Sequence, residues 1–499
     1  MPNANTDPDA ATDSAPTATG KEPRRPSVLI LSHALTGHLA PLLRIAASLQ
    51  ARGWRTYFLG PTAHQHRIEA AGSVFLPLRA DADLDDRAYY ESPPAGAAYA
   101  SLPWPQRVLE DLRAQVLQPL PTQWSCVRDA LSTLHAAAPD PSPGVVVLAE
   151  AFFFGVLPLF YGAALPPGVP PPLGSVCVSV TVPAIRSADL PPAGYAFAPD
   201  ASAAGRARNA ALWERSWARK AAALTALLDE RMREAGARRG VGEVFLSGAN
   251  YTAHETILQL GVPGLEYPRS DWPAGFKFAG LVQGGASSTS TTPATAPLFP
   301  WWSEILANAA LPPSHPAKRK ILVVAQGTVE TNPEDLILPT LRAFASRSDV
   351  LVVAILGWKD ACLSAPDIPA NARVADYLSY DAALAHADAW IHNGGFGAVG
   401  HGVAHGVPMV VAGEGMDKAD NARRVAWAGV GVDLGTATPT SAQVREGVEQ
   451  VLQDEQYARR VRELRRESEE LDCFGLVHGE LLRIAETRPG VRQRGLETQ

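Results

Sequence analysis

The stretch SVLILSHALTGHLAPLLRIAASLQARGWRTYFLG, at residues 27–60, decides the fold. An apolar run is followed by a loop and by a helical pattern over 38–51, which Gly53 ends, and a second apolar run comes directly afterwards. A third run follows one helix-length segment later, so strands and helices alternate. That order predicts a parallel sheet covered by helices. The three predicted strands are 28–32, 56–59 and 74–78.

The alternation of strands and helices occurs twice along the chain. It continues with an apolar run at 145–149, and it starts again after Trp301 and Trp302. Between the two series, residues 283–300 are mostly Gly, Ser, Thr, Ala and Pro, which favours a solvated linker. A chain of 499 residues also exceeds one ordinary core, so two doubly wound α/β domains facing across a cleft are expected. The later predicted strands are 321–325, 350–356, 390–391 and 409–411, with a helix after Pro333.

Composition excludes several classes of protein. The net charge of −7 provides no basic field for nucleic acid. The longest apolar run, 145–165, contains Glu150, Gly155 and Pro158 and divides into a strand and a helix, so no stable membrane insertion is expected. Residues 1–26 lack the apolar core of a signal peptide and are interpreted as a disordered tail. The cysteines form no CxxC pair, which fits a reducing, cytoplasmic location; they are Cys126, Cys177, Cys362 and Cys473.

The glycine-rich segment HNGGFG, at residues 392–397, leaves a predicted strand and opens a helix. Its backbone N–H groups could approach a diphosphate at the positive helix end, although a tight turn also requires glycine there. His392 could donate to the same oxygens or be a satisfied histidine at a strand end. Further on, Asp417 at the carboxyl end of a strand could accept hydrogen bonds from sugar hydroxyls and also cap the next helix.

In the N-terminal half, Gly37 and His38 lie between a predicted strand and its helix. A neutral imidazole there could take a proton from a hydroxyl, because the pKa of histidine lies near working pH. Glu150 closes a neighbouring strand, where it could hold the other ring nitrogen or be a buried structural acid.

Two further patterns could suggest a metal, and we interpret both as structural. Asp81 and Asp83 have DxD spacing, but they lie in an acidic loop that fits a solvated surface or a helix cap. His401 and His405 lie four residues apart on a predicted helix, yet Gly402 stands where a zinc protease has glutamate, and no third ligand is evident. We therefore expect no metal and no cofactor.

Taken together, the motifs resemble those of family 1 glycosyltransferases. The segment HNGGFGAVGHGVAHGVPMVVAGEGMDKADNA, at residues 392–422, resembles their donor-binding box. Residues 37–41, GHLAP, resemble the GHxxP catalytic segment, Glu150 falls where the aspartate of the catalytic dyad lies, and residues 326–328 resemble the phosphate loop. The likeness spans residues 27–487, and its variants are closer to fungal and some bacterial members than to plant ones. Such branches include macrolide, sterol, phenolic and glycolipid transferases.

The resemblance implies a GT-B fold, metal-independent transfer and inversion at the anomeric carbon. It makes His38 the base and Glu150 its orienting acid, and it gives His392 and Thr328 to the diphosphate. It also gives Asp417 to the sugar hydroxyls and Tyr377 to stacking on the nucleotide base. The full set of implied donor-binding residues is Gln326, Gly327, Thr328, Tyr377, His392, Gly394, Gly395, Phe396, Gly397, Asp417, Lys418 and Asn421.

The chain also departs from the family pattern. Glu150 replaces aspartate, Gly400 stands where relatives place a ribose ligand, Gly413 replaces the box proline, and Lys418 replaces glutamine. UDP-glucose is the expected donor, ahead of GDP-mannose and dTDP sugars. The expected reaction is hexose transfer to a hydroxyl of a polyol, phenolic, sterol or lipid, with peripheral membrane contact if the acceptor is a lipid. A nucleotide-sugar epimerase and a non-catalytic nucleotide-sugar binder are the alternatives.

With these roles, the predicted organisation has six parts. They are a tail (1–26), an acceptor-binding Rossmann-like domain (27–282), a linker (283–302), a nucleotide-sugar-binding Rossmann-like domain (303–470), a C-terminal helix that packs back on the N-terminal domain (471–487) and a second tail (488–499).

Overall fold

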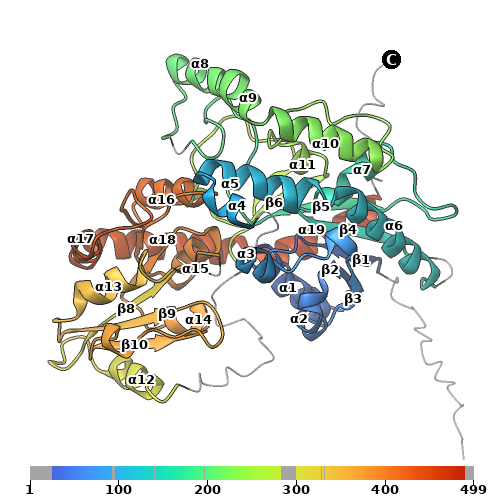
Figure 1. Cartoon of the computed structure of the whole chain (residues 1–499). Helices are drawn as coiled ribbons and strands as arrows, with labels where there is room; N and C mark the ends of the chain where they lie inside the picture. The colour runs from blue at the N-terminus through green and yellow to red at the C-terminus, as the bar shows by residue number, and fades with distance from the viewer. Residues whose placement is uncertain are drawn as a thin grey trace, which may run out of the picture.

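The computed structural model describes residues 25–92, 96–139, 142–195, 197–282, 299–327, 329–330 and 332–488. Within them the chain forms two parallel sheets, each covered by helices (Figure 1). Residues 1–24 of the predicted tail, most of the predicted linker, Thr328 and residues 489–499 of the second predicted tail lie outside the described residues.

The N-terminal sheet has the strand order β3-β2-β1-β4-β5-β6-β7, and all its pairs are parallel. Its strands are β1 (Ser27–Leu31), β2 (Thr56–Gly60), β3 (Val74–Pro77), β4 (Val145–Glu150), β5 (Gly174–Ser179), β6 (Thr256–Gln259) and β7 (Phe276–Phe278). Its helices are α1 (Thr36–Ala51), α2 (Gln65–Ala70), α3 (Asp86–Glu91), α4 (Gly96–Ser101), α5 (Trp104–Asp111), α6 (Leu120–Ala136), α7 (Leu157–Phe160), α8 (Ala203–Ala211), α9 (Ala218–Lys220), α10 (Ala222–Glu234) and α11 (Ala249–Thr252).

The C-terminal sheet has the order β10-β9-β8-β11-β12-β13 and is also parallel throughout. Its strands are β8 (Lys320–Ala325), β9 (Val350–Ile355), β10 (Ala372–Ala375), β11 (Ala389–His392), β12 (Met409–Val411) and β13 (Gly431–Asp433). The helices from residue 302 onward are α12 (Trp302–Ala310), α13 (Ile337–Phe344), α14 (Tyr380–Leu384), α15 (Phe396–His405), α16 (Lys418–Trp427), α17 (Ser441–Gln453), α18 (Glu455–Leu471) and α19 (Cys473–Thr487).

The two sheets are buried on both faces, which is why their strands are nearly continuous apolar runs. In β1 and β4, alternate residues enter two separate clusters, so that Leu29 and Val147 face one layer of helices while Ile30 and Leu148 face the other. The last helix, α19, joins the second of these layers through Val477. It thus packs on the N-terminal sheet although it ends the C-terminal half.

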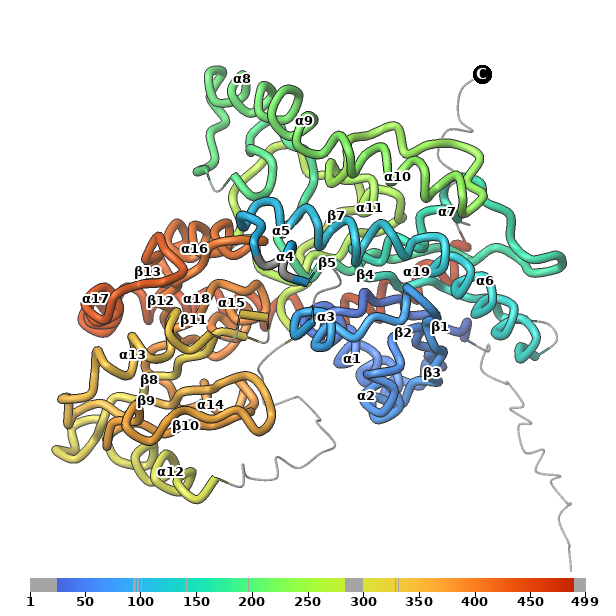
Figure 2. Tube along the Cα trace, in the orientation of Figure 1, coloured from blue at the N-terminus to red at the C-terminus, as the bar shows by residue number. Residues whose placement is uncertain are grey.

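Segment α3–α5 crosses from the N-terminal half to the C-terminal half (Figure 2). Its Trp104 lies directly on Gly415, because a Cβ at this glycine would be only 1.7 Å from Cε2 of the indole. Arg87 in α3 also stacks over the ring of Trp358, 5.0 Å from its centre. This segment of the N-terminal half therefore makes direct side-chain contacts with the C-terminal half.

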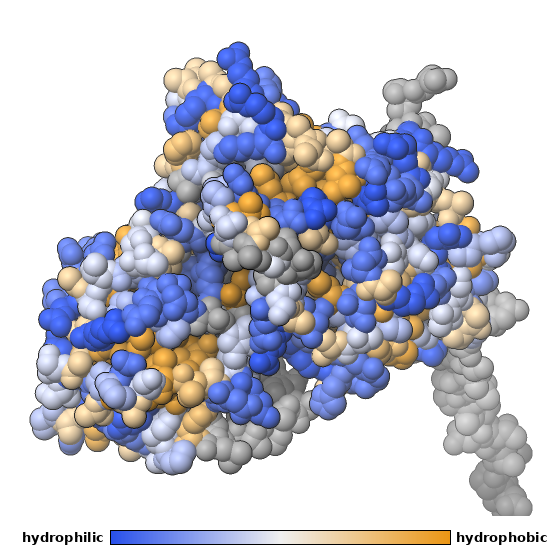
Figure 3. Space-filling model, in the orientation of Figure 1, coloured by the Kyte–Doolittle hydropathy of each residue, from blue (hydrophilic) through white to orange (hydrophobic). Residues whose placement is uncertain are grey.

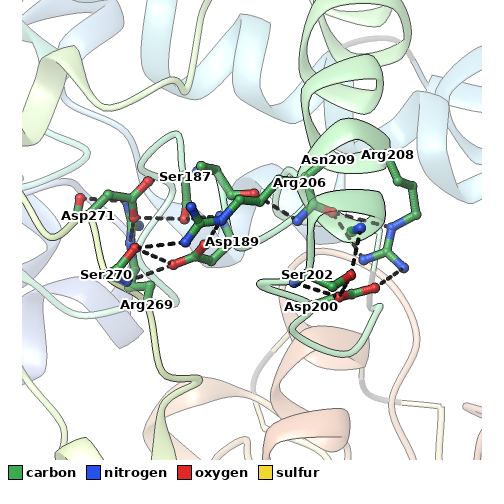
Figure 4. A network of polar contacts seen from close by, with 12 residues as sticks. Ser187, Asp189, Asp200, Ser202, Arg206, Arg208, Asn209, Arg269, Ser270 and Asp271 are labelled. Carbon is green, nitrogen blue, oxygen red and sulfur yellow. Dashed lines mark hydrogen bonds and ion pairs between the residues drawn. The ribbon is translucent and has the colours of Figure 1, made fainter.

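A polar network anchors the loop before α8 (Figure 4). The Asp189 carboxylate accepts hydrogen bonds from Ser270 N and Oγ and from Nε of Arg206, at 2.7, 2.8 and 2.8 Å. Asp271 likewise accepts from Ser187 Oγ, at 2.8 Å. Hydrogen bonds from Ser270 hold the pKa of Asp189 below its usual range, so the network keeps this carboxylate charged.

The strands that the apolar runs predicted are present with ends shifted by at most two residues, and the run at 145–165 divides into β4 and a helical segment ending at α7. The sequence missed five strands, which are β5, β6, β7, β10 and β13. Among the described residues, no helix combines the length and apolar character of a membrane span. On the face drawn in Figure 3, hydrophobic residues form separate groups among hydrophilic ones.

Candidate functional site

His38 and Glu150 meet at the carboxyl edge of the N-terminal sheet. His38 lies in the first turn of α1, which follows β1, and Glu150 ends the adjacent strand β4. Nδ1 of His38 is 3.1 Å from Oε1 of Glu150, although the two groups are not well aligned for a hydrogen bond. The same oxygen accepts a hydrogen bond from the backbone N–H of Phe152 at 3.0 Å, which fixes the carboxylate. Contacts of this kind commonly tighten when substrate binds.

The charge on Glu150 favours protonation of His38. Burial is the largest single effect and lowers the pKa of His38, but the carboxylates of Glu150, Asp417 and Asp86 together outweigh it, so the pKa is raised above its ordinary value of 6.5. The neighbouring His33 differs, because burial and the charge of His38 lower its pKa to about 4. His33 accepts from Leu35 N–H through Nδ1 and donates through Nε2 to the carbonyl of Gln115, at 3.2 and 3.1 Å. Of the two histidines, His38 is therefore the one that binds a proton more strongly.

Asp417 of the C-terminal half lies close enough to His38 for each charge to act on the other. The Asp417 carboxylate helps to raise the pKa of His38, and His38 opposes the rise in the pKa of Asp417 that burial causes. Asp417 immediately precedes α16, and Asn421 in that helix donates from Nδ2 to the carbonyl of Gly394 at 2.8 Å. The fold thus brings the predicted base and the predicted sugar ligand to one place.

His392 stabilises the glycine-rich loop that follows β11. Its Nδ1 accepts from Gly394 N–H at 3.0 Å, its ring stacks on Trp390, and burial lowers its pKa to about 3. The neutral ring therefore carries its proton on Nε2, which has no partner among the described residues. Gly394 adopts φ +85°, and a Cβ there would lie 2.9 Å from the Lys418 carbonyl. Nε2–H of His392 thus remains available as a hydrogen-bond donor, and position 394 beside it accepts only glycine.

The sequence reasoning missed Asn393 of this loop and Glu330 of the loop that follows β8. Asn393 donates from Nδ2 to the carbonyl of Gln326 and to Oε2 of Glu330, the latter at 3.1 Å. Glu330 in turn pairs with the ammonium group of Lys418, which is 6% exposed. The side chain of Gln326 is occupied within its own loop, because it donates to Asn332 O at 2.9 Å. An asparagine next to a loop histidine is the signal that could have indicated Asn393.

Other predicted donor residues lie apart from these contacts. Tyr377 is 64% exposed, so one face of its ring is free to stack. Gly397 has open space around it, while Phe396 lies against Gly261 of the N-terminal half. Gly395 precedes α15 as its N-cap residue.

Asp83, the second aspartate of the DxD pattern, binds the start of a turn. The Asp83 carboxylate accepts from Thr62 N and Oγ1, each at 2.7 Å, at the start of a short 3₁₀ turn, Thr62–His64. By contrast, the expectation that His401 and His405 lack a third ligand is wrong, because Asp381 lies beside both. Asp381 was missed because it lies in another helix, whose approach depends on tertiary packing.

The sequence is similar to known proteins over most of its length. Residues 343–473 match the family model described as erythromycin biosynthesis protein CIII-like, C-terminal domain. The chain is 33% identical over 469 residues to UDP-glucosyltransferase 1 of Beauveria bassiana, covering 92% of this chain and 95% of that protein. It is 32% identical over 464 residues to UDP-glucosyltransferase A1 of Starmerella bombicola, with coverage of 92% and 93%.

Solved structures show the same fold. The glycosyltransferase of kitacinnamycin matches with a TM-score of 0.63 at 20% identity, over 93% of this chain and 100% of that one. The calicheamicin glycosyltransferase CalG4 matches with a TM-score of 0.62 at 18% identity, over 93% and 99%. Two facing Rossmann-like domains of this kind form the GT-B fold. The chain belongs to family 1 of the glycosyltransferases, the UDP-glycosyltransferase superfamily.

Proposed function

We propose that this glycosyltransferase transfers glucose from UDP-glucose to a hydroxyl of a small molecule, with inversion and with His38 as the base. The observation that carries the proposal is the His38–Glu150 pair facing Asp417 from the other half of the molecule. The names of the relatives, which are UDP-glucosyltransferases, favour this donor. GDP-mannose and dTDP sugars are the next candidates.

In this proposal the acceptor oxygen attacks the anomeric carbon as the bond from that carbon to the diphosphate oxygen breaks. The hydroxyl proton passes to Nε2 of His38, because Nδ1 faces Glu150. Asp417 accepts hydrogen bonds from sugar hydroxyls and so holds the anomeric carbon near the attacking oxygen. The nucleoside diphosphate leaves with the electrons of the broken bond, and its charge is met by Nε2–H of His392 and by backbone N–H groups at the start of α15.

Product analysis tests the reaction class. Incubation with a panel of nucleotide sugars and hydroxyl acceptors, followed by mass spectrometry, should give a product heavier by one hexose residue, with release of UDP. An epimerised donor with no new glycosidic bond would identify an epimerase instead, and donor binding without any turnover would identify a binder. The anomeric configuration, read by proton NMR, decides between inversion and retention.

Transfer should continue after removal of divalent cations. In the proposal a helix terminus and side chains meet the diphosphate charge, so no metal bridge is required. We expect the same initial rate in EDTA as in magnesium or manganese. An activity that EDTA abolishes and either metal restores would contradict this reading of the donor site.

His392→Ala should weaken donor binding and turnover together. A hydrogen bond to a charged oxygen contributes about 1.5–3 kcal/mol, so the donor Kd should rise by roughly one to two orders of magnitude. Calorimetric titration with the nucleotide sugar measures this, and acceptor affinity should be unchanged. His386→Ala, in the turn after α14, is the matched control. An unchanged donor Kd in a folded His392→Ala protein would show that this loop does not bind the diphosphate.

A further inference from the structure

Three potential ligand atoms converge where the two halves of the protein meet. Nδ1 of His401 and Nε2 of His405 each lie 2.9 Å from the same oxygen, Oδ1 of Asp381. All three ligand atoms lie within 4.8 Å of one another. The group shares no residue with the transfer site formed by His38 and Glu150.

The local structure explains why these atoms meet. His401 and His405 are four residues apart in α15, so they project from one face of the helix. Asp381 lies in the first turn of α14, and the neighbouring Tyr380 packs edge-on against the His401 ring at 5.4 Å. The side chains of the three polar residues are 27%, 17% and 14% exposed for Asp381, His401 and His405. The group is therefore shielded but not sealed from solvent.

Arg44 completes the surroundings of the carboxylate from the N-terminal half. Its guanidinium donates to Oδ2 of Asp381, the oxygen that the histidines do not use, and to the carbonyl of Val282 at 3.1 Å. Carboxylates that bind metals are typically held in this way, with one oxygen on the ion and the other on an outer hydrogen-bond donor. Arg44 thus occupies the carboxylate oxygen that the histidines leave free.

We propose that Asp381, His401 and His405 bind one divalent transition-metal ion of the zinc type. Two imidazole nitrogens and one carboxylate oxygen suit zinc or cobalt, whereas magnesium and calcium prefer oxygen ligands alone. Tetrahedral bonds of about 2.0–2.1 Å separate ligand atoms by about 3.3 Å, so the present 2.9 Å contacts would open by only a few tenths of an ångström. Through Arg44, the bound ion would strengthen the link between α1 and the C-terminal half.

Cobalt provides a direct readout that does not depend on activity. The full chain, free of any affinity tag, is treated with EDTA, desalted and titrated with Co²⁺ while its visible absorption is recorded. We expect saturation at one equivalent with the intense absorption of a low-coordinate cobalt site, and displacement by Zn²⁺. No saturable absorption in the wild-type protein would overturn the proposal and leave a metal-free hydrogen-bond network.

Variants assign the site to these residues. Asp381→Asn, His401→Gln and His405→Gln should each raise the Zn²⁺ Kd at least about tenfold by calorimetry, whereas His386→Gln should leave it unchanged. Arg44→Gln keeps all three ligands and should weaken Zn²⁺ binding by roughly tenfold. Circular dichroism identifies variants that fail to fold. Folded ligand variants that bind Zn²⁺ as tightly as the wild type would refute the assignment.

Discussion

His38→Ala should lower kcat by roughly 10²–10⁴ with an aliphatic alcohol as acceptor while leaving donor binding nearly intact. An alcohol is a poor nucleophile until its proton leaves, and in the proposed mechanism His38, next to Glu150, takes that proton. A phenol gives up its proton more easily, so the loss should be smaller with a phenolic acceptor. Steady-state kinetics with one acceptor of each kind, together with donor titration, measure both effects.

The wild-type pH profile gives a second view of the same group. Because the pKa of His38 is raised above 6.5, its neutral form is lost as the pH falls through a value above 6.5, and kcat/KM should decline there. This decline toward acid pH, the acid limb of the profile, should be absent from the residual activity of His38→Ala. His33→Gln is a useful comparison, since His33 is already neutral over this range and its loss should leave the limb in place. Full activity of His38→Ala toward an alcohol would show that His38 is not the base.

The sequence predicted the alternation of strands and helices because fully buried parallel strands appear as continuous apolar runs. It missed β6 and β10, which have only four residues each, and β7 and β13, which have three. Runs so short carry no readable period by themselves. β11 and β12 are equally short, but they could be predicted because they adjoin the glycine-rich segment 392–397 and the Gly406-Val407-Pro408 turn. β5 was missed although it has six residues, because it follows a proline-rich segment.

The same reasoning explains which parts of the site could be predicted. His38 and Glu150 follow adjacent parallel strands, so their meeting follows from topology once the sheet is predicted. Arg44 and Asp381 are 337 residues apart, and they meet only because the two halves pack together. No local pattern encodes that contact. Asn393 was missed for another reason. The sequence does not show which of the two neighbouring side chains, His392 or Asn393, takes part in the site, because this depends on the side of the sheet that each one takes at the end of β11.

Glu150→Gln should lower kcat on the order of 10², because the carboxylate stabilises the imidazolium that forms as His38 takes the proton. The substitution keeps the shape of the side chain but removes its charge. Since that charge raises the pKa of His38, the acid limb of kcat/KM should move to lower pH in the variant. A purely structural role for Glu150 would lower activity without moving the limb.

The double variant His38→Ala/Glu150→Gln tests whether the two residues act as one unit. Once His38 is absent no imidazolium forms, and the charge of Glu150 has nothing left to stabilise. The double variant should therefore be little slower than His38→Ala alone, a large departure from additivity that reflects the 3.1 Å contact between the two side chains. Losses that multiply instead would mean that Glu150 acts independently, for example on an acceptor hydroxyl. Unfolding measurements on all three variants separate this coupling from instability, because Glu150 is 1% exposed and its amide must still accept from Phe152 N–H.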